Sequence, residues 1–311
     1  MEKYDLIIIG AGPSGLTAAL YAGRAGYTML MIEKTGPGGQ IMLTDKIDNY
    51  PGFEDGISGF ELQDKLYKQA VKFGLHMISD SVISIKKEND LFIVSTLTGK
   101  TFTSISVILS TGATHRLLGV QGESRLSGKG VSYCGTCDGP FYRNREVVII
   151  GGGDTALTEA LFIAKFAKKI TIIHRKETFR AVSSLIKQTT SLPNISFIMN
   201  SVVTEITGEN EVNGVVVNNI KTGAIETLKT DGVFVFVGLD PNTDFVDSSL
   251  LDKAKYIITN DKMETSVKGL FAAGDVRSET FRQIVCACSD GAKSAQYAGE
   301  FIDEQKGNSY Q

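Results

Sequence analysis

An apolar run at residues 4–9 stands near the start of the chain and stops at a cluster of glycines, residues 10–15. Apolar side chains then recur at helical spacing from Leu16 to Gly23, and a second apolar run, residues 28–32, ends in Glu33. Short continuous apolar runs are typical of buried strands, and the intervening periodicity is typical of a helix. The pattern predicts a strand, a tight glycine turn, a helix and a second strand.

The same pattern recurs in the middle of the chain. An apolar run at residues 147–150 leads into a second glycine turn, residues 151–156. A predicted helix then extends to about Lys168, and residues 170–173 form the next apolar run. Because strand, glycine turn and helix are the parts of a dinucleotide-binding unit, the repeat predicts two nucleotide sites and an α/β fold with two Rossmann-like domains.

The first copy carries the chemistry of a dinucleotide site with an unmodified ribose. Its glycines let backbone amides approach a pyrophosphate, and the helix N-terminus supplies partial positive charge. Glu33 lies roughly 20 residues after the first glycine, where an acidic residue binds the ribose hydroxyls. We therefore assign FAD to this copy.

The second copy differs at the residue that sets cofactor preference. The position equivalent to Glu33 is His174, followed by Arg175 and Lys176, with Arg180 five residues further on. An acidic residue would repel a ribose 2′-phosphate, whereas Arg and Lys pair with it. We assign NADPH to this copy; a merely solvated basic strand end is the alternative interpretation.

The order of these units indicates an insertion. An apolar strand at residues 107–109 and the turn at residues 110–113 mark the exit from the first domain, and residues 238–243 mark the return. A short buried strand then ends in Gly274-Asp275, and a helix is predicted from about Arg282 to Asp303. The expected domains are residues 1–112 and 243–311 for FAD, and residues 113–242 for NADPH.

Cys134 and Cys137 form a C-x-x-C motif directly before Asp138. This spacing allows a small reversible disulfide, and thiol exchange needs a group that protonates the leaving sulfur, so Asp138 is a candidate acid and base. Two other interpretations are half of a zinc site, for which Cys286 and Cys288 have unsuitable spacing, and inert buried thiols. Because the motif lies in the inserted domain, access of both the disulfide and NADPH to one flavin predicts rotation about linkers near residues 112 and 238.

Composition narrows the class of protein. The 311 residues carry a net charge of −3, so no broad basic field favours nucleic acid or an anionic membrane as partner. The apolar runs are too short to span a membrane, and residues 1–5 lack the pattern of a secretory signal, so we expect a cytoplasmic protein. From the spacing of the cysteines we expect no metal site. Only four cysteines are present, too few for the disulfide framework of a secreted domain.

Nine separate motifs, in order, resemble the low-molecular-weight thioredoxin reductases of bacteria. They are residues 10–15, 38–40, 49–52, 111–113, 134–139, 151–156, 174–181, 238–243, and 272–277 with 282–283. The larger glutathione-reductase type carries its cysteines early in the flavin domain, where residues 36–40 have none here. The resemblance covers nearly the whole chain.

The resemblance implies a homodimer that passes electrons from NADPH through FAD and the disulfide to thioredoxin. It implies that Cys137 is the sulfur nearer the flavin, that Cys134 attacks the disulfide of thioredoxin, and that Phe141 and Tyr142 help dock the partner. The implied FAD-site residues are Gly10, Gly12, Pro13, Ser14, Gly15, Glu33, Lys34, Gly39, Gln40, Thr44, Asn49, Val82, Thr111, Gly112, Ala113, Gly274, Asp275, Arg282, Gln283 and Ile284. The implied NADPH-site residues are Gly153, Asp154, Thr155, Ala156, Glu159, His174, Arg175, Lys176 and Arg180.

Several positions depart from the family pattern. Lys176 replaces an Arg, which weakens the preference for NADPH and leaves NADH open as a donor, because Lys lacks the bidentate fork. Thr158 replaces a Glu, Gln121 replaces a Pro, and Cys286 and Cys288 stand in a run that usually has no cysteine. Two other functions stay open at this level: reduction of a peroxiredoxin or a glutaredoxin-like carrier, and a non-catalytic flavoprotein, which would leave the C-x-x-C without a role.

Overall fold

The structure is a computed structural model that describes residues 2–44, 46–278 and 280–308. The chain folds into two compact units: unit 1 comprises Met1–Thr114 and Asp240–Gln311, and unit 2 comprises His115–Leu239. The expected boundaries at residues 112 and 242 lie within three residues of these positions. Both units are mixed α/β, which confirms the predicted fold class.

Unit 1 is built on a seven-stranded sheet with the order β3-β2-β1-β6-β5-β4, in which β17 also pairs with β6. Strands β1, β2, β3, β6 and β17 run parallel, and β4 and β5 form an antiparallel hairpin at one edge. The strands are β1 (Glu2–Ile9), β2 (Met29–Glu33), β3 (His76–Ser79), β4 (Val82–Glu88), β5 (Leu91–Thr96), β6 (Thr101–Leu109) and β17 (Leu270–Ala272).

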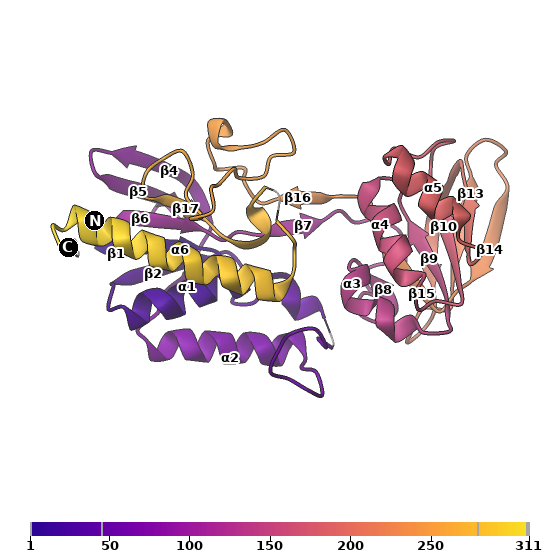
Figure 1. The fold of residues 1–311 in the computed structure, drawn as a ribbon, viewed down its shortest axis with the longest axis horizontal. Helices are drawn as coiled ribbons and strands as arrows, with labels where there is room; N and C mark the ends of the chain where they lie inside the picture. Colours follow the sequence, from indigo (N-terminus) through magenta and orange to yellow (C-terminus); the bar gives the residue numbers. More distant parts are fainter. Residues whose placement is uncertain (1, 45, 279, 309–311) are drawn as a thin grey trace. The chain divides into compact units, whose positions relative to one another are not determined.

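The described residues of unit 1 form three α-helices, two of which pack on the sheet while the third packs against one of these two. They are α1 (Pro13–Arg24), α2 (Gly59–Lys72) and α6 (Ile284–Gln305), with the short 3-10 helices η1 (Gly39–Leu43), η3 (Ser248–Leu250) and η4 (Gly274–Val276) in the loops. Figure 1 shows α1 and α6 side by side along the sheet. Their small residues let the helices approach closely: Ala18, Ala19 and Ala22 of α1 and Ala295 and Ala298 of α6 are buried in one core cluster. A second cluster, which includes Ile7, Val107 and Leu270, covers the opposite face.

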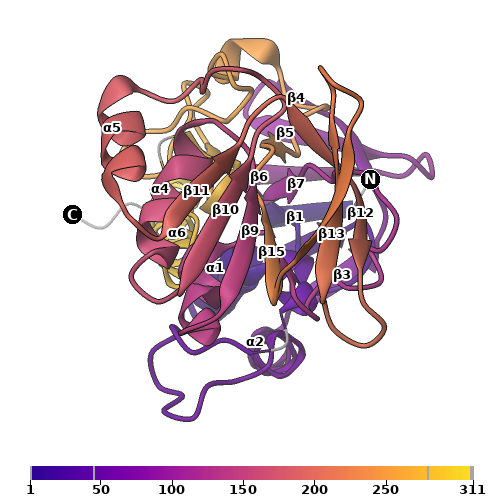
Figure 2. The same ribbon diagram turned by 90° about the vertical axis from the view of Figure 1, so that its right-hand side faces the viewer.

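Unit 2 contains a parallel five-stranded sheet with the order β11-β10-β9-β15-β8. Helices α4 (Asp154–Ile163) and α5 (Ser183–Ser191) cover one face, and an antiparallel sheet of β12, β13 and β14 covers the other (Figure 2). The strands are β8 (Val131–Ser132), β9 (Glu146–Ile150), β10 (Lys169–Ile173), β11 (Ile195–Ile198), β12 (Ser201–Thr207), β13 (Gly214–Asn219), β14 (Ile225–Lys229) and β15 (Gly232–Val235). The short helices α3 (Gly135–Asp138) and η2 (Gly139–Tyr142) lie between β8 and β9.

Two short strands, β7 (Ala113–His115) and β16 (Leu239–Pro241), pair with each other where the chain passes between the units. The side chain of Asn242 adds a bond to this pair, because its Nδ2 donates to the Thr111 carbonyl over 2.8 Å. The two connections therefore form a hydrogen-bonded ribbon rather than two independent linkers.

The predicted helix after the second glycine turn is too long. The sequence pattern predicts that it reaches about Lys168, but α4 ends at Ile163 and residues 164–166 form a turn. Beyond Ile163, the side-chain amide of Asn194 donates to the carbonyls of Ala164 and Ala167 over 3.0 and 3.1 Å, and the Lys168 N–H donates to the Arg145 carbonyl. These bonds satisfy the carbonyls outside a helix. The last helix, expected over residues 282–303, is displaced by two residues, as α6 runs over Ile284–Gln305.

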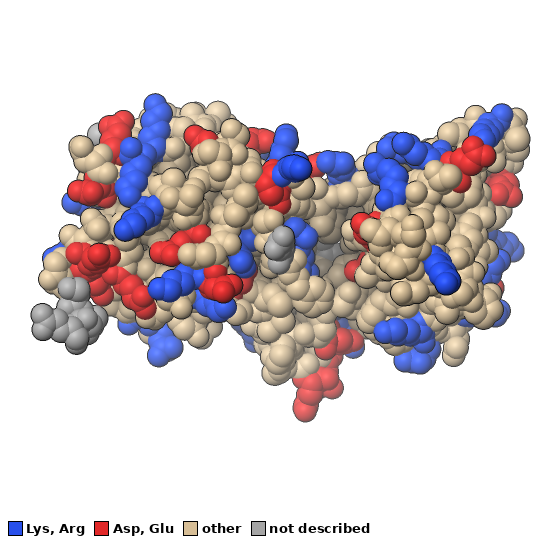
Figure 3. Space-filling model, turned by 45° about the horizontal axis from the view of Figure 1, so that its top comes forward, with Lys and Arg blue, Asp and Glu red and all other residues tan. Residues whose placement is uncertain are grey.

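The surface charge of the described residues is mixed. On the face drawn in Figure 3, Lys and Arg side chains are interspersed with Asp and Glu. None of the helices in the described ranges combines the length and apolar composition that crossing a bilayer requires.

Candidate functional site

In each parallel sheet, the chain first adds strands on one side of a central strand and later adds strands on its other side. In unit 1 the chain goes from β1 to β2 and β3 on one side, while β6 lies on the other side; in unit 2, β9 is flanked by β10 and β15 in the same way. Ligands of doubly wound sheets bind beyond the carboxyl end of the strand at such a switch point. The first glycine turn follows β1 and the second follows β9, so both stand at switch points.

The first turn leaves the start of α1 open for an anion. Gly12 is the N-cap residue of α1, no side chain caps this helix, and its first turn has no acidic residue. A side chain at Gly12 would meet no atom within 4 Å, so the space above the turn is free. Gly10 has φ +102° and lies against the Ser110 backbone, which only glycine permits. Uncapped amides beside free space fit the pyrophosphate of FAD.

Glu33, the acidic residue at the end of β2, binds the first glycine turn through hydrogen bonds. Glu33 Oε2 accepts the backbone N–H of Ala11 over 2.7 Å, and Oε1 accepts the N–H of Thr35 over 3.0 Å. The carboxylate thus lies beside the glycine turn, and the exposed Lys34 follows it. In Gly39–Leu43, the next segment, the Gln40 amide donates to the Ala113 carbonyl, and Gly39 faces Gly12.

Other expected FAD-site residues come together within unit 1. Asn49 Nδ2 donates to Gln283 Oε1 over 3.0 Å, directly before Ile284 at the start of α6, where no side chain caps the helix. Thr44 ends η1, and Thr111 and Gly112 bond to Asn242. Val82 stands apart from these contacts: it begins β4 and packs against the core cluster of Ile7 and Val107.

Gly274 and Asp275 lie at the end of β17, against the start of α1. A side chain at Gly274 would lie 2.7 Å from Ser14 Oγ, so the two segments touch. Burial raises the pKa of the Asp275 carboxyl to about 6, the Arg282 cation opposes this rise, and the Asp290 carboxylate adds to it. The Arg282 guanidinium stacks on the ring of Tyr256, 4.2 Å from its centroid, which holds the cation in place.

The second turn repeats this geometry in unit 2. Gly153 is the N-cap of α4, no side chain caps the helix, and a side chain at Gly153 would meet nothing within 4 Å. Asp154, the first residue of α4, turns toward the basic loop and accepts the N–H of Val182 over 2.8 Å, while the Arg180 N–H donates to the Gly152 carbonyl. The loop carrying the basic residues is thereby bound to the turn, which fits a nucleotide with a 2′-phosphate.

His174 differs from the other basic residues of this loop. Its ring is buried under Gly152 and stacks on Phe179 with 5.6 Å between centroids, whereas Arg175, Lys176 and Arg180 are exposed. Burial and the neighbouring cations lower the pKa of His174. The imidazole is therefore neutral at pH 7, and three cations remain to face a phosphate. Sequence spacing could not show this, because the burial of His174 depends on its tertiary contacts with Gly152 and Phe179.

The C-x-x-C motif forms a disulfide, with 5.3 Å between the Cα atoms of Cys134 and Cys137. Cys134 is the N-cap of α3, and its Sγ accepts the N–H of Cys137 over 3.1 Å. The Cys134 N–H donates to Ser132 Oγ over 3.1 Å, which ties the motif to the end of β8. Asp138, half-buried, is the last residue of α3.

Glu159 of α4 lies beside this disulfide, in contact with Gly135 and Thr136. Burial raises the pKa of its carboxyl, and bonds from Thr136 and Gly135 oppose the rise. Tyr142 is turned inward: its ring packs edge-on against Phe234 with 5.1 Å between centroids, whereas Phe141 is 41% exposed.

The other two cysteines lie in unit 1, away from the C-x-x-C motif in sequence. Cys286 and Cys288 are free thiols near the start of α6, and Tyr50 donates to Cys288 Sγ over 3.7 Å. In the described part of the chain, no cluster of three or more His, Cys, Asp or Glu could hold a metal ion.

Comparisons with known proteins agree with this geometry. Residues 4–291 match the family described as pyridine nucleotide-disulphide oxidoreductase. The thioredoxin reductase of Treponema pallidum is 46% identical over 96% of this chain and 97% of its own length, and that of Bacillus subtilis is 42% identical over 97% and 95%. The crystal structure of thioredoxin reductase from Streptococcus pyogenes matches with a TM-score of 0.94 at 42% identity, over 97% of this chain and 99% of that one. The chain therefore belongs to the pyridine nucleotide-disulphide oxidoreductase family, among the thioredoxin reductases that use FAD and NADPH.

Proposed function

We propose that the disulfide of α3 is the site through which this chain performs thioredoxin-disulfide reduction, with Cys134 as the attacking thiol, Cys137 as the thiol nearer the flavin and Asp138 as the acid and base. The observation that carries the proposal is the Cys134–Cys137 bond in the same unit as the second nucleotide turn. The comparisons favour thioredoxin over another thiol carrier as the acceptor.

The remaining roles follow from the two turns. Unit 1 would hold FAD through Gly10, Gly12, Ser14 and Glu33, and unit 2 would hold NADPH through Gly153, Arg175, Lys176 and Arg180. Bound in unit 1, FAD would supply an acceptor for the hydride of NADPH and a two-electron donor for the disulfide. Since the disulfide and the NADPH turn lie in one unit, we propose that the β7–β16 ribbon bends to bring each to the flavin in turn.

The exchange with thioredoxin balances with the residues of α3. The Cys134 thiolate attacks the thioredoxin disulfide, a mixed disulfide forms, and the leaving thioredoxin sulfur takes a proton that Asp138 supplies. The Cys137 thiolate then attacks Cys134 Sγ, which restores the Cys134–Cys137 bond and expels the second thioredoxin sulfur as a thiolate. This thiolate takes a proton from water, and thioredoxin leaves as a dithiol. Phe141 is exposed next to this segment and offers an apolar contact for the partner.

Two further proposals concern the state of the protein. We propose a homodimer formed by unit 1, on which Tyr21, Phe60 and Phe281 are large apolar side chains with exposed fractions of 47%, 67% and 65%. We also propose a cytoplasmic location, because a dithiol cycle that NADPH drives needs a reducing compartment. Light scattering of the purified protein tests the dimer.

A trapping experiment tests the assigned thiol roles. The probe is a thioredoxin with a single cysteine, activated as a mixed disulfide with an aromatic thiol. Cys137→Ser leaves Cys134 to attack this probe without a resolving thiol, so a stable mixed disulfide between the two proteins should accumulate. Cys134→Ser should give none under the same conditions. The reverse pattern would exchange the two roles, and trapping by neither variant would remove the pair from the mechanism.

A further inference from the structure

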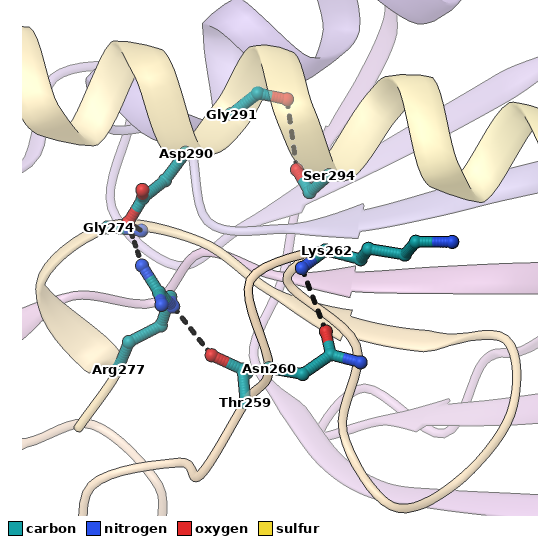
Figure 4. Close-up of polar contacts among 8 residues, drawn as sticks. All are labelled: Thr259, Asn260, Lys262, Gly274, Arg277, Asp290, Gly291 and Ser294. Atoms are coloured by element: carbon teal, nitrogen blue, oxygen red, sulfur yellow. Dashed lines mark hydrogen bonds and ion pairs between the residues drawn. The ribbon is translucent and has the colours of Figure 1, made fainter. Parts of the chain in front are cut away.

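A buried ion pair joins the last helix of unit 1 to the Gly274–Val276 turn. Arg277 Nη1 lies 2.6 Å from Asp290 Oδ2, and the two side chains are only 13% and 12% exposed. Figure 4 shows Asp290 pointing from α6 toward the loop and Arg277 reaching up from the residues after η4. A pair this deeply buried is not explained by stability alone, since apolar residues of similar volume often stabilise as well.

Both partners of the pair bind backbone or side chains of neighbouring segments. The same oxygen, Asp290 Oδ2, accepts the backbone N–H of Gly274 over 3.2 Å. Arg277 Nε donates to Thr259 Oγ1 over 2.8 Å, on the loop before β17 (Figure 4). One carboxylate thus fixes the first residue of the Gly274-Asp275 turn, and the guanidinium fixes the carboxylate.

The segments held by the pair converge on the first turn of α1. Gly274 has φ +78°, and its missing side chain would lie 2.7 Å from Ser14 Oγ. Gly291, the neighbour of Asp290, lies against the Ser14 backbone, where a side chain would be 3.0 Å from the carbonyl carbon. Gly274 and Gly291 therefore enclose Ser14 from two sides, and Asp290 bonds to one of them and is covalently joined to the other.

We propose that the Arg277–Asp290 pair is a positioning element for FAD: it presses the Gly274-Asp275 turn against Ser14, so that the protein's affinity for FAD depends on it. The inference rests on the assignment of FAD to unit 1. Ordering two protein segments at the moment of binding costs free energy and lowers the affinity for a ligand that bridges them. If α1 and the end of β17 are already held together, FAD binds without this cost.

The charge around Asp275 supports this role. The Asp290 carboxylate adds to the raised pKa of Asp275, so the two acids repel each other across the turn. Arg277 neutralises Asp290 at 2.6 Å and limits that repulsion. Because Arg277 reaches Asp290, and Asp290 in turn binds the Gly274 N–H, both residues act on the first turn of α1 through Gly274. They are therefore positioning residues.

The test measures FAD binding to deflavinated protein by titration, together with the thermal stability of the same deflavinated variants. Arg277→Met combined with Asp290→Leu replaces the buried pair by apolar groups, which preserves folding but leaves the Gly274 N–H without its acceptor. We expect the dissociation constant for FAD to rise roughly tenfold or more. Arg277→Met combined with Asp290→Asn keeps an oxygen that can accept the Gly274 N–H but removes the guanidinium that fixes it. This variant should therefore lose affinity as well, and full affinity in it would show that the ion pair is not required.

The matched control is Asp5→Asn, which breaks the ion pair of 2.7 Å between Asp5 and Lys306 at the other end of α6. It should lower stability and leave the affinity for FAD within about twofold of the starting protein. Unchanged affinity in the Met/Leu variant, or equal losses in the Met/Leu variant and the control, would overturn the proposed role. A starting protein that binds no FAD would instead overturn the assignment of FAD to unit 1, and the inference with it.

Discussion

The carboxylate of Glu159 occupies the space that a side chain on Gly135 would need. Gly135 follows Cys134 in the redox motif, and Glu159 comes from the helix that begins at the second nucleotide turn. The disulfide and the NADPH turn are thus joined by direct packing inside one unit. Any displacement of α4 at this contact reaches the sulfur pair.

Gly135→Ala should slow thiol exchange. The added methyl group displaces Glu159 or shifts the start of α3, and a small misplacement of reacting groups costs roughly 10- to 100-fold in rate. Steady-state reduction of thioredoxin measures the loss. Gly139→Ala is the control, because its nearest contact would be 3.2 Å from the flexible side chain of Ile163. Equal activity of the two variants would show that the Glu159 contact does not matter.

Asp138→Asn should slow the exchange step by roughly 100-fold or more, because the amide cannot supply a proton to the leaving sulfur. The reduction of flavin by NADPH does not involve this residue and should keep its rate. Stopped-flow measurement of flavin bleaching and a separate assay of thioredoxin reduction distinguish the steps. A variant that loses flavin bleaching as well would place Asp138 in a structural role.

Lys176→Arg should raise the preference for NADPH over NADH. The guanidinium of Arg pairs with two phosphate oxygens at once, whereas the ammonium group of Lys has no such planar fork. The buried ring of His174 cannot supply the missing contact to the phosphate. We expect the ratio of kcat/KM for the two donors to rise roughly 3- to 10-fold. Lys187→Arg, an exposed substitution on α5, serves as the control. A ratio that stays constant or falls would remove Lys176 from the phosphate site.

Asp275→Asn should stabilise the deflavinated protein at neutral pH. Burial raises the pKa of this carboxyl to about 6 in the folded state, above its value of roughly 4 in an unfolded chain. The favourable state is the protonated one, so the Asp-containing protein loses stability as pH rises from about 4 to 6. Above pH ~6 the variant should be more stable by up to about 3 kcal/mol, and below pH ~4 the difference should vanish. Denaturant unfolding at several pH values measures this; a constant difference would contradict the shifted pKa.

Much of the fold was predictable because its central strands are continuous apolar runs. The runs at residues 4–9, 28–32, 147–150 and 170–173 correspond to β1, β2, β9 and β10 within one or two residues. The β4–β5 hairpin and the β12–β14 sheet were not predicted, since their strands are partly exposed and lie outside the repeated pattern of strand, glycine turn and helix. Their pairing depends on partners that local patterns do not reveal.

For the candidate site, motif spacing located the two turns and the sulfur pair, but not the side chains that support them. The pairing of Arg277 with Asp290 joins residues on two elements, and neither has a pattern of its own. The burial of His174 under Gly152 depends on how the basic loop folds back. Such contacts arise from tertiary packing, which a single sequence encodes without local signals.

The most direct test of the account is an anaerobic titration of the FAD-loaded protein with NADPH, followed by oxidised thioredoxin, monitored by flavin absorbance. In the unmodified protein the absorbance of oxidised flavin should disappear with NADPH and return when thioredoxin is added. In the variant with Cys134→Ser and Cys137→Ser it should disappear in the same way and stay low after thioredoxin is added. Recovery of the absorbance in that variant would contradict the proposal that electrons leave through Cys134 and Cys137.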